Sequence, residues 1–469
     1  MMNDTLPDRL RAIVGDPHCL TTADALAPYQ EEQRGRFRGR AAAVVRPATT
    51  DEAAAVLRAC ADTWTPVVPQ GGNTGLVGGA AAPEGAVVVA TERLNRLRRV
   101  DPAGDTLTVE AGAVLADVQR AAADADRLFP LSLAAEGSAR IGGNLAANAG
   151  GVHVLRYGMA RDLVRGVEAV LPDGSVYSGL DRPVKDNTGY ALDQLLVGSE
   201  GTLGLITAAT LRLVPPHRQT ATALAAVPDA ESALALLNRA RGEAGDVLAA
   251  CELLPRRGLD FVTRHIPGAR DPFDGAYPWF VLLELASPRA DGTLPDLLAT
   301  LLGAAFESGE AVDGVVASSE AQRHALWHLR ESLPGAQKPE GGSIKHDVSV
   351  PVAAVPDFLA RATAAAEAEV PGVRPVPFGH LGDGNIHFNL TQPEGLDRDA
   401  FLAHWDAMNR VVHDVVAAMG GSIAAEHGIG RLKPAELARV RDPVALDAMR
   451  RVKNALDPDG IMNPGVLFP

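Results

Sequence analysis

The sequence predicts an α+β fold of two or three domains, and three observations lead to that prediction. The chain has 469 residues, which is more than one ordinary hydrophobic core contains. Segments with helical spacing at 51–62 and 114–125 alternate with short β-type segments at 86–90 and 107–111. Glycine is concentrated in three dense runs in the first half of the chain. We therefore expect small α+β subdomains that could hold a large cofactor.

The other elements continue this mixture. Residues 67–68 form a strand that leads into a glycine-rich loop, and 166–178 form a hairpin around Pro172-Asp173-Gly174, which are typical turn residues. After Pro215-Pro216 we expect helices and strands of a sheet with helices on one face, at 230–240, 280–285, 295–308, 344–350 and 355–369, and then mostly helix over 397–456. The expected domains are 1–216, 217–410 and 411–469.

Composition and charge exclude several classes of protein. A formal net charge of -14 disfavours binding to nucleic acid or to an anionic membrane. The three cysteines, Cys19, Cys60 and Cys251, are too far apart for a disulfide framework or an iron–sulfur motif. The first 17 residues do not resemble a signal peptide, and the apolar runs are too short to span a bilayer. A cytoplasmic protein without a transmembrane segment is expected.

The three glycine runs are the strongest local signal. The first is PQGGNTGLVGG at 69–79, the second GSARIGGNLAANAGG at 137–151, and the third GSEGTLG at 198–204. Such runs let backbone amides approach a phosphate or a long cofactor closely. The first run lacks both the Rossmann pattern and the Gly-Lys-Ser/Thr of a P-loop, and by itself it also fits a surface loop.

The second half of the chain contains a candidate metal motif, PFGHLGDGNIHFN at 377–389. In a strand His387 and Asn389 share one face, and the glycine-rich turn can bring His380 back beside His387. Glu426, in AEHGIG at 425–430, is a candidate third ligand, because two imidazoles and a carboxylate commonly bind zinc. The histidines alone fit a structural role equally well. Glu426 and His427 must lie on a bend to act together.

These motifs together resemble the FAD-binding domain of the vanillyl-alcohol oxidase and p-cresol methylhydroxylase (PCMH) superfamily, in its D-2-hydroxyglutarate, D-lactate and glycolate dehydrogenase branch. The resemblance includes LRYG at 155–158 and KDNTGY at 185–190 and covers nearly the whole chain. It implies a PCMH-type FAD domain of two α+β subdomains, a substrate (cap) domain with an antiparallel sheet, and a C-terminal helical segment near the flavin. The residues it assigns to noncovalent FAD are Gly71, Gly72, Asn73, Thr74, Gly75, Gly79, Gly137, Ser138, Gly143, Asn144, Asn148, Gly150 and Gly204.

The same resemblance assigns the remaining site residues. It implies zinc ligation by His380, His387 and Glu426, a general base at His427, and substrate contacts from Arg330, Lys345 and Asn389. Arginine and lysine beside a metal suit a dicarboxylate substrate. One position departs from the D-2-hydroxyglutarate enzymes: Pro334 stands where they carry a hydroxyl residue, four positions after the arginine.

The expected function is oxidation of a D-2-hydroxy acid to the 2-oxo acid, most specifically of D-2-hydroxyglutarate. Electrons would pass to a separate acceptor such as an electron-transfer flavoprotein or a quinone, and the resemblance also implies a homodimer. A D-lactate or glycolate dehydrogenase is an alternative within the branch. A metal-dependent hydrolase would leave the glycine runs unexplained, and a noncatalytic flavin-carrying subunit would bind FAD without turning over a hydroxy acid.

Overall fold

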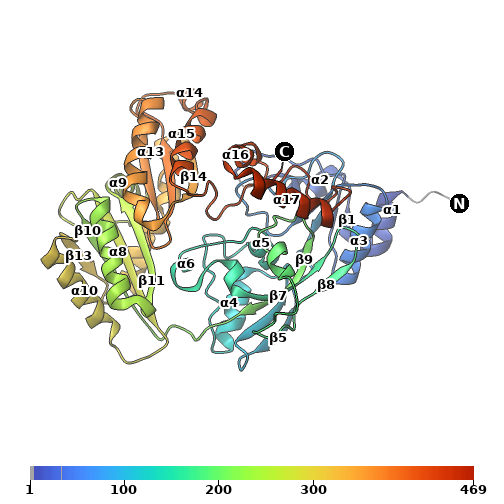
Figure 1. Ribbon diagram of the computed structural model, residues 1–469, viewed down its shortest axis with the longest axis horizontal. Coiled ribbons are helices and arrows are strands. Elements are labelled where there is room, and N and C mark those ends of the chain that lie inside the picture. Colours follow the sequence, from blue (N-terminus) through green and yellow to red (C-terminus); the bar gives the residue numbers. More distant parts are fainter. Residues whose placement is uncertain (1–4, 33, 469) are drawn as a thin grey trace. The chain divides into compact units, whose positions relative to one another are not determined.

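The computed structural model describes residues 5–32 and 34–468, and their contacts divide the chain into two compact units (Figure 1). Unit 1 contains three segments, Met1–Gly151, Gly158–Pro215 and Glu426–Pro469, and unit 2 contains Val152–Tyr157 and Pro216–Ala425. In the described ranges, every helix is too short or too polar to cross a membrane.

Unit 1 contains two sheets, consistent with the predicted α+β class. A four-stranded sheet has the order β1-β2-β4-β3, in which β2, β4 and β3 are parallel, and a five-stranded antiparallel sheet has the order β5-β6-β9-β7-β8. The strands are β1 (Cys19–Leu20), β2 (Ala43–Val45), β3 (Val67–Gln70), β4 (Val87–Ala90), β5 (Leu97–Asp101), β6 (Thr106–Glu110), β7 (Val164–Val170), β8 (Val176–Ser178) and β9 (Leu205–Arg212).

The helices of unit 1 cover these sheets. They are α1 (Leu6–Val14), α2 (Ala23–Gln30), α3 (Thr50–Ala61), α4 (Leu115–Asp124), α5 (Ile141–Ala146), α7 (Leu192–Leu196), α16 (Pro434–Val440) and α17 (Pro443–Leu456). Helix α3 begins where the Thr49 side chain accepts a hydrogen bond from the Glu52 amide. Both faces of the parallel strands are buried, because Val67 and Val87 pack in one apolar core and Val88 in another.

Unit 2 is built on a seven-stranded, fully antiparallel sheet with the order β13-β10-β12-β11-β15-β16-β14. A fully antiparallel sheet in this unit agrees with the predicted α+β class. The strands are β10 (Gln219–Val227), β11 (Leu248–Pro255), β12 (Trp279–Ser287), β13 (Asp313–Val316), β14 (Ser343–Ser349), β15 (Arg374–His380) and β16 (Asn385–Thr391).

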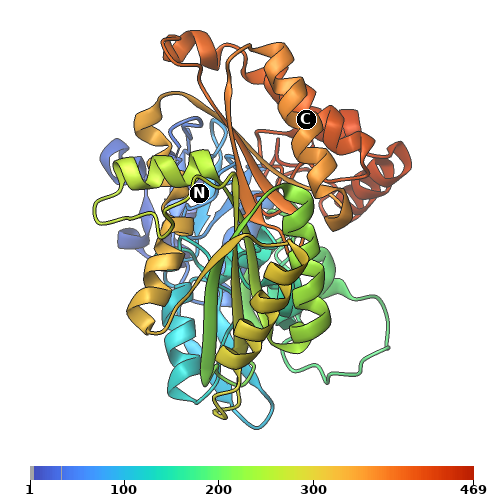
Figure 2. The same ribbon diagram turned by 90° about the vertical axis from the view of Figure 1, so that its left-hand side faces the viewer.

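Helices lie on both sides of this sheet rather than on one (Figure 2), which corrects the expectation of a single covered face. Helices α8 (Ala230–Ala244), α10 (Leu294–Ser308), α13 (Val355–Glu369) and α15 (Trp405–Ala418) form one group, and α9 (Arg256–His265), α11 (Glu320–Glu331) and α12 (Leu333–Ala336) form the other. The short helices α6 (Val154–Tyr157) and α14 (Arg398–Leu402) complete the unit. The second group of helices buries Phe280, Trp327 and Phe378 in one apolar core.

The segment Val152–Tyr157 belongs to unit 2 although its neighbours in sequence belong to unit 1. Arg156 Nη1 donates to the carbonyl oxygen of Ala286, and Tyr157 Oη lies 2.7 Å from His217 Nε2. The chain therefore passes from unit 1 to unit 2 and back at this point, in addition to the crossings after Pro215 and Ala425.

Candidate functional site

The three glycine runs, which are far apart in the sequence, meet within unit 1. A Cβ atom at Gly72 would lie 2.0 Å from the Ser138 carbonyl oxygen, so the first and second runs are in direct backbone contact. The amides of Gly198 and Glu200 donate to carbonyl oxygens of the second run, at 2.9 and 2.8 Å. The runs therefore form one continuous surface that consists largely of backbone.

Part of this surface fits a long polar cofactor. Among residues 5–32 and 34–468, no atom would lie within 4 Å of a Cβ built at Gly75, Gly137 or Gly143, so there is open space beside these glycines. Asn144 is 7 % exposed, and its Oδ1 has no hydrogen-bond partner in the described part of the chain. Exposed backbone and an unsatisfied buried acceptor are features that a bound FAD would use.

Two of the asparagines assigned to FAD also shape the surface. Asn73 and Asn148 have φ angles of 53° and 49°, in the left-handed region that asparagine tolerates better than most residues. Asn73 Nδ2 donates to the Glu31 carbonyl oxygen, and Asn148 Oδ1 accepts from the Arg161 amide. Thr74 follows Asn73 in the same loop, and Ser138 lies exposed on the second run.

The remaining glycines assigned to FAD are closely packed. The Gly79 carbonyl accepts from Asn463 Nδ2 at 3.0 Å, and a Cβ at Gly204 would lie 2.8 Å from the Val170 carbonyl oxygen. A Cβ at Gly150 would lie 3.0 Å from Glu426 Oε2. Within unit 1, Glu426 therefore lies against the second glycine run.

Glu426 and His427 lie in a bend, as the sequence required. His427 Nε2 is 3.6 Å from Glu426 Oε1. The carboxylate of Glu200, in the third glycine run, holds the chain just beyond them, because its two oxygens accept from the amides of Ile429 and Gly430 at 2.9 and 2.7 Å. Burial raises the pKa of Glu200, and these two N–H groups oppose that shift only in part.

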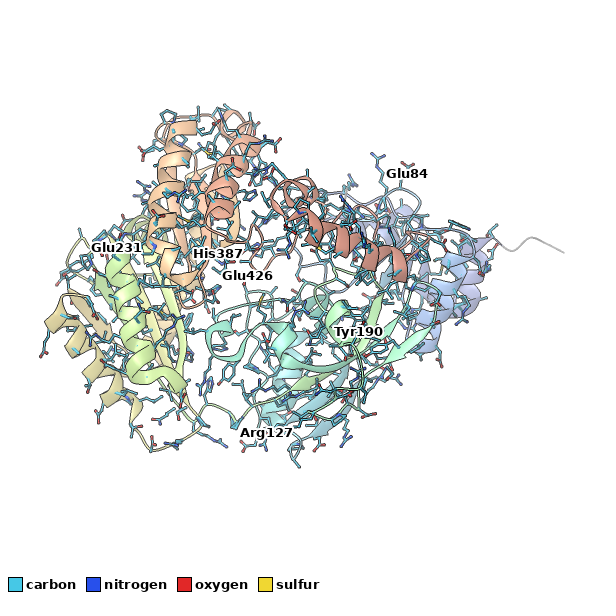
Figure 3. All side chains as sticks on the ribbon, in the orientation of Figure 1. Glu84, Arg127, Tyr190, Glu231, His387 and Glu426 are labelled. Carbon is cyan, nitrogen blue, oxygen red and sulfur yellow. The ribbon has the colours of Figure 1, made fainter. Side chains whose placement is uncertain are left out.

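In unit 2, the hairpin of β15 and β16 brings the two predicted histidines together. Phe378 on β15 faces His387 on β16, and His380 lies two residues further along β15, on the same face of the sheet. The imidazole centroids of His380 and His387 are 5.6 Å apart. His387, labelled in Figure 3, is therefore part of a two-histidine cluster, as the motif at 377–389 predicts.

The neighbouring strand β14 adds a carboxylate and a lysine to the same face. Asp347 pairs with His387, and Lys345 pairs with Asn389. Asp347 Oδ1 lies 3.9 Å from His387 Nδ1 and accepts from Asn385 Nδ2 at 3.0 Å. This face of the sheet thus carries imidazole, carboxylate and ammonium groups together.

Arg330 reaches this face from α11. Its Nε donates to Glu252 Oε2 on β11 at 2.6 Å, and the other oxygen of Glu252 lies 2.6 Å from His380 Nδ1. Burial opposes ionisation of Glu252, but His380 and Arg330 together bring its pKa down to about 2. Asn389 is also held in place, because its Nδ2 donates to Gln337 Oε1 at 3.0 Å.

The chain leaves unit 2 close to this cluster. The amide of Ala425, the last residue of unit 2, donates to the Asp347 carbonyl oxygen at 3.3 Å, and Glu426 follows it directly. Asp347, His387, Glu426 and His427 are all of the residue types that bind metal ions.

Comparison with known protein families shows to which family this chain belongs. Residues 216–467 match the model of the C-terminal domain of FAD linked oxidases, and residues 41–179 match an FAD binding domain. The chain belongs to the FAD-linked oxidase family. The prediction of a flavin-dependent dehydrogenase of the D-2-hydroxyglutarate dehydrogenase branch is thereby confirmed, together with FAD as its cofactor.

Relatives of this FAD-linked oxidase match over nearly their full length. A D-2-hydroxyglutarate dehydrogenase of Xanthomonas citri pv. viticola is 36 % identical over 94 % of this chain and 92 % of its own. One from Stutzerimonas stutzeri is 34 % identical over 100 % of both chains. A crystal structure of p-cresol methylhydroxylase with substrate bound has a TM-score of 0.77 at 17 % identity, covering 98 % of this chain and 95 % of that one. The predicted PCMH-type α+β fold is confirmed.

Three polar residues that lie beside predicted site residues were not predicted from the sequence: Glu200, Glu252 and Asp347. Glu252 is the only charged residue of β11, an otherwise apolar strand, and a lone carboxylate in such a strand must have a partner. This pattern could have identified Glu252 from the sequence. Alternation along β14 could also have placed Asp347 on the face of Lys345.

The contact between the first two glycine runs gives a direct prediction. A Gly72→Ala variant should lower the stability of the apoprotein by about 1–3 kcal/mol or more, because a Cβ atom cannot lie 2.0 Å from the Ser138 oxygen. It should also lose FAD. Thermal unfolding of the apoprotein and the FAD content after purification measure both effects. Gly75→Ala is the matched control for the stability of the apoprotein, since its Cβ would meet no atom of the described residues within 4 Å; equal melting temperatures for the two apoprotein variants would contradict the packing.

Proposed function

We propose that this protein oxidises D-2-hydroxyglutarate to 2-oxoglutarate with FAD and a divalent metal, which we take to be zinc. The observation that carries the proposal is the common face of the unit 2 sheet. His380 and His387 lie there with Lys345, and Arg330 reaches it through Glu252. Two cations beside candidate metal ligands suit a substrate with two carboxylates. The named D-2-hydroxyglutarate dehydrogenase relatives support this substrate.

The glycine runs would hold FAD, which when bound accepts a hydride from the substrate carbon. Gly71 and Gly72 let the first run approach the second, and the open space beside Gly75 and Gly143 leaves backbone accessible. The amide oxygen of Asn144 would accept a hydrogen bond that the described residues do not supply. Noncovalent binding is expected, since we find no attachment signal in the sequence.

His380, His387 and Glu426 would hold the metal, with Asp347 as a further carboxylate beside His387. Neutral imidazoles and carboxylates are ligands typical of zinc. A bound divalent ion supplies Lewis acidity, which lowers the pKa of a coordinated hydroxyl group. In this scheme His427 accepts the hydroxyl proton as the general base, next to Glu426 on the bend that Glu200 fixes.

Arg330, Lys345 and Asn389 would bind the carboxylates of the substrate. Nε of Arg330 is occupied by Glu252, and in the described residues its two terminal nitrogens have no hydrogen-bond partner. A planar guanidinium presenting two N–H groups suits bidentate binding of a carboxylate. Asn389, fixed by Gln337, would add a neutral contact from the same face.

D-lactate or glycolate is the second candidate substrate, and Pro334 favours it. This residue lies in α12, four positions after Arg330, and cannot donate the hydrogen bond expected of a hydroxyl residue there. Both substrates have one carboxylate and would not need Arg330. Measuring how much Arg330 contributes to substrate specificity therefore distinguishes the dicarboxylate from the monocarboxylate candidates.

An Arg330→Met variant is expected to raise KM for D-2-hydroxyglutarate about 10- to 100-fold, which is what loss of a charge-assisted hydrogen-bond pair costs. Steady-state assays with a dye acceptor should compare D-2-hydroxyglutarate, D-malate, D-lactate and glycolate for the wild type and the variant. The ratio of kcat/KM for D-2-hydroxyglutarate to that for D-lactate corrects for general damage. If wild-type activity is highest with a monocarboxylate and the ratio is unchanged in the variant, the dicarboxylate assignment is wrong.

We also propose a separate electron acceptor, an electron-transfer flavoprotein or a quinone, because the sequence has no haem-attachment or iron–sulfur motif. A cytoplasmic location and a homodimer are further proposals. The location is supported by the three cysteines, which are all buried and unpaired, as expected in a reducing compartment. Sedimentation of the purified holoenzyme would test the dimer.

A further inference from the structure

Glu252 is a buried carboxylate, and a contribution to stability does not by itself explain why a charged residue lies at this position. It is 1 % exposed, in the middle of β11, and its cross-strand partner is His380. A buried ion pair seldom stabilises a fold more than apolar side chains of the same size. The neighbouring positions Leu253 and Leu254 show that the strand accommodates apolar side chains here. A role beyond packing is therefore indicated.

One oxygen of Glu252 determines which nitrogen of His380 can bind a metal. An ionised carboxylate only accepts hydrogen bonds, so His380 Nδ1, at 2.6 Å from Oε1, must carry the proton. The lone pair of the neutral ring then lies on Nε2. A carboxylate behind a histidine in this way fixes the tautomer and the ring orientation that a metal ligand needs.

The other oxygen of Glu252 fixes Arg330. Its bond to Nε, at 2.6 Å, holds one edge of the guanidinium, while the Phe378 ring lies 4.9 Å from the guanidinium carbon. Arg330 is 6 % exposed. The plane of the guanidinium is thus set from two sides, and the terminal nitrogens are left to bind an anion.

We propose that Glu252 is a positioning residue that couples metal binding by His380 to substrate-carboxylate binding by Arg330. The coupling arises because the single carboxylate of Glu252 bonds to both side chains. If this carboxylate rotates to follow one of them, its hydrogen bond to the other breaks. The inference rests on the proposed roles of His380 and Arg330. Glu252 would thus be an additional residue of the site, and loss of Arg330 should weaken metal binding.

Glu252→Gln is the decisive variant because it keeps the size and changes the hydrogen-bonding pattern. A glutamine amide has one acceptor oxygen and one donor nitrogen, so it cannot accept from both partners. If the oxygen faces Arg330, the NH₂ group faces His380 Nδ1, and the ring proton must move to Nε2, where it blocks metal binding. We expect zinc affinity to fall about 10- to 100-fold and KM for D-2-hydroxyglutarate to rise in the same variant.

The matched control is Glu284→Gln. Glu284 is also a buried glutamate of the same sheet, on the adjacent strand β12, and accepts from Trp327 Nε1 and Thr222 Oγ1 at 2.6 and 2.9 Å. It touches no proposed metal or substrate residue. Its replacement should lower the melting temperature without changing zinc affinity or KM, which separates a general effect of losing a buried carboxylate from the coupling.

The experiment measures zinc affinity by chelator competition on the metal-free, FAD-loaded protein, with melting temperature and KM alongside. The variants are Glu252→Gln, Glu284→Gln, His380→Ala, Arg330→Met and the double variant Glu252→Gln/Arg330→Met. Arg330→Met should weaken zinc binding although no described metal candidate bonds to it, and should add little in the Glu252→Gln background. This arm remains informative if Glu252→Gln alone does not fold.

Two results would overturn the inference, and they differ in meaning. If His380→Ala loses zinc affinity while Glu252→Gln and Arg330→Met bind zinc like the wild type, the metal site stands and the coupling through Glu252 is wrong. If His380→Ala binds zinc as tightly as the wild type, the proposed metal site is wrong and the inference fails with it.

Discussion

Replacing His427 with glutamine is expected to lower kcat by about 10²- to 10⁴-fold, the usual contribution of a general base. An imidazole suits this task because its ordinary pKa lies near neutral pH. The neighbouring structure holds the segment of His427 in position, as a general base requires. It lies in a bend beside Glu426, and the Glu200 carboxylate holds the next residues through the amides of Ile429 and Gly430. Stopped-flow reduction of the flavin by D-2-hydroxyglutarate measures the step directly.

The variant should retain FAD and zinc, since His427 is assigned to neither. His324→Gln is the control for losing a histidine, because His324 is largely exposed on α11. It should reduce the flavin at the wild-type rate. A His427→Gln protein that is also reduced at that rate would exclude His427 as the base.

Removal of the metal is expected to lower turnover at least about 100-fold, because Lewis-acid activation contributes several kcal/mol and each 1.36 kcal/mol is a factor of ten. The protein should stay yellow, since the residues assigned to FAD are different residues from those assigned to the metal. Zinc or manganese added to the dialysed protein should restore turnover. Elemental analysis before and after chelation gives the stoichiometry, expected to be about one metal per chain.

His387→Ala should bind FAD but should not recover activity on addition of metal. His265→Ala is the matched control in unit 2, because His265 bonds to Glu340 at 2.7 Å and is assigned neither to the metal nor to the substrate. Full turnover by protein shown to be free of metal would contradict the metal-dependent scheme, and the cluster would then be structural.

The strands and helices of this protein could largely be predicted from local pattern. The strand expected at 280–285 is β12, that at 344–350 is β14, and the hairpin around Pro172-Asp173-Gly174 is formed by β7 and β8. These elements have the alternating or apolar patterns that burial in a sheet imposes. The order of the strands could not be predicted in this way, because β11 lies beside β15 although more than 100 residues separate them.

The same limit applies to the candidate site. The hairpin that pairs His380 with His387 is local, and the glycine pattern at 377–389 predicts it. Glu252 is 128 residues from His380 and 78 from Arg330, so no local pattern connects them. The Glu200 contact with Ile429 spans 229 residues. Motifs therefore identify the groups that would do chemistry, whereas the residues that position them come from elsewhere in the fold.

Anaerobic reduction of the bound flavin by single substrates tests the assigned activity most directly. Purified holoenzyme is mixed without an acceptor with D-2-hydroxyglutarate, D-malate, D-lactate or glycolate, and the visible flavin absorption is followed. Fast bleaching by D-2-hydroxyglutarate is expected, with slower bleaching by the monocarboxylates and none by L-2-hydroxyglutarate in a parallel control. The assigned activity would be contradicted if the flavin stays oxidised with D-2-hydroxyglutarate, D-malate, D-lactate and glycolate alike, in protein that is loaded with FAD and zinc.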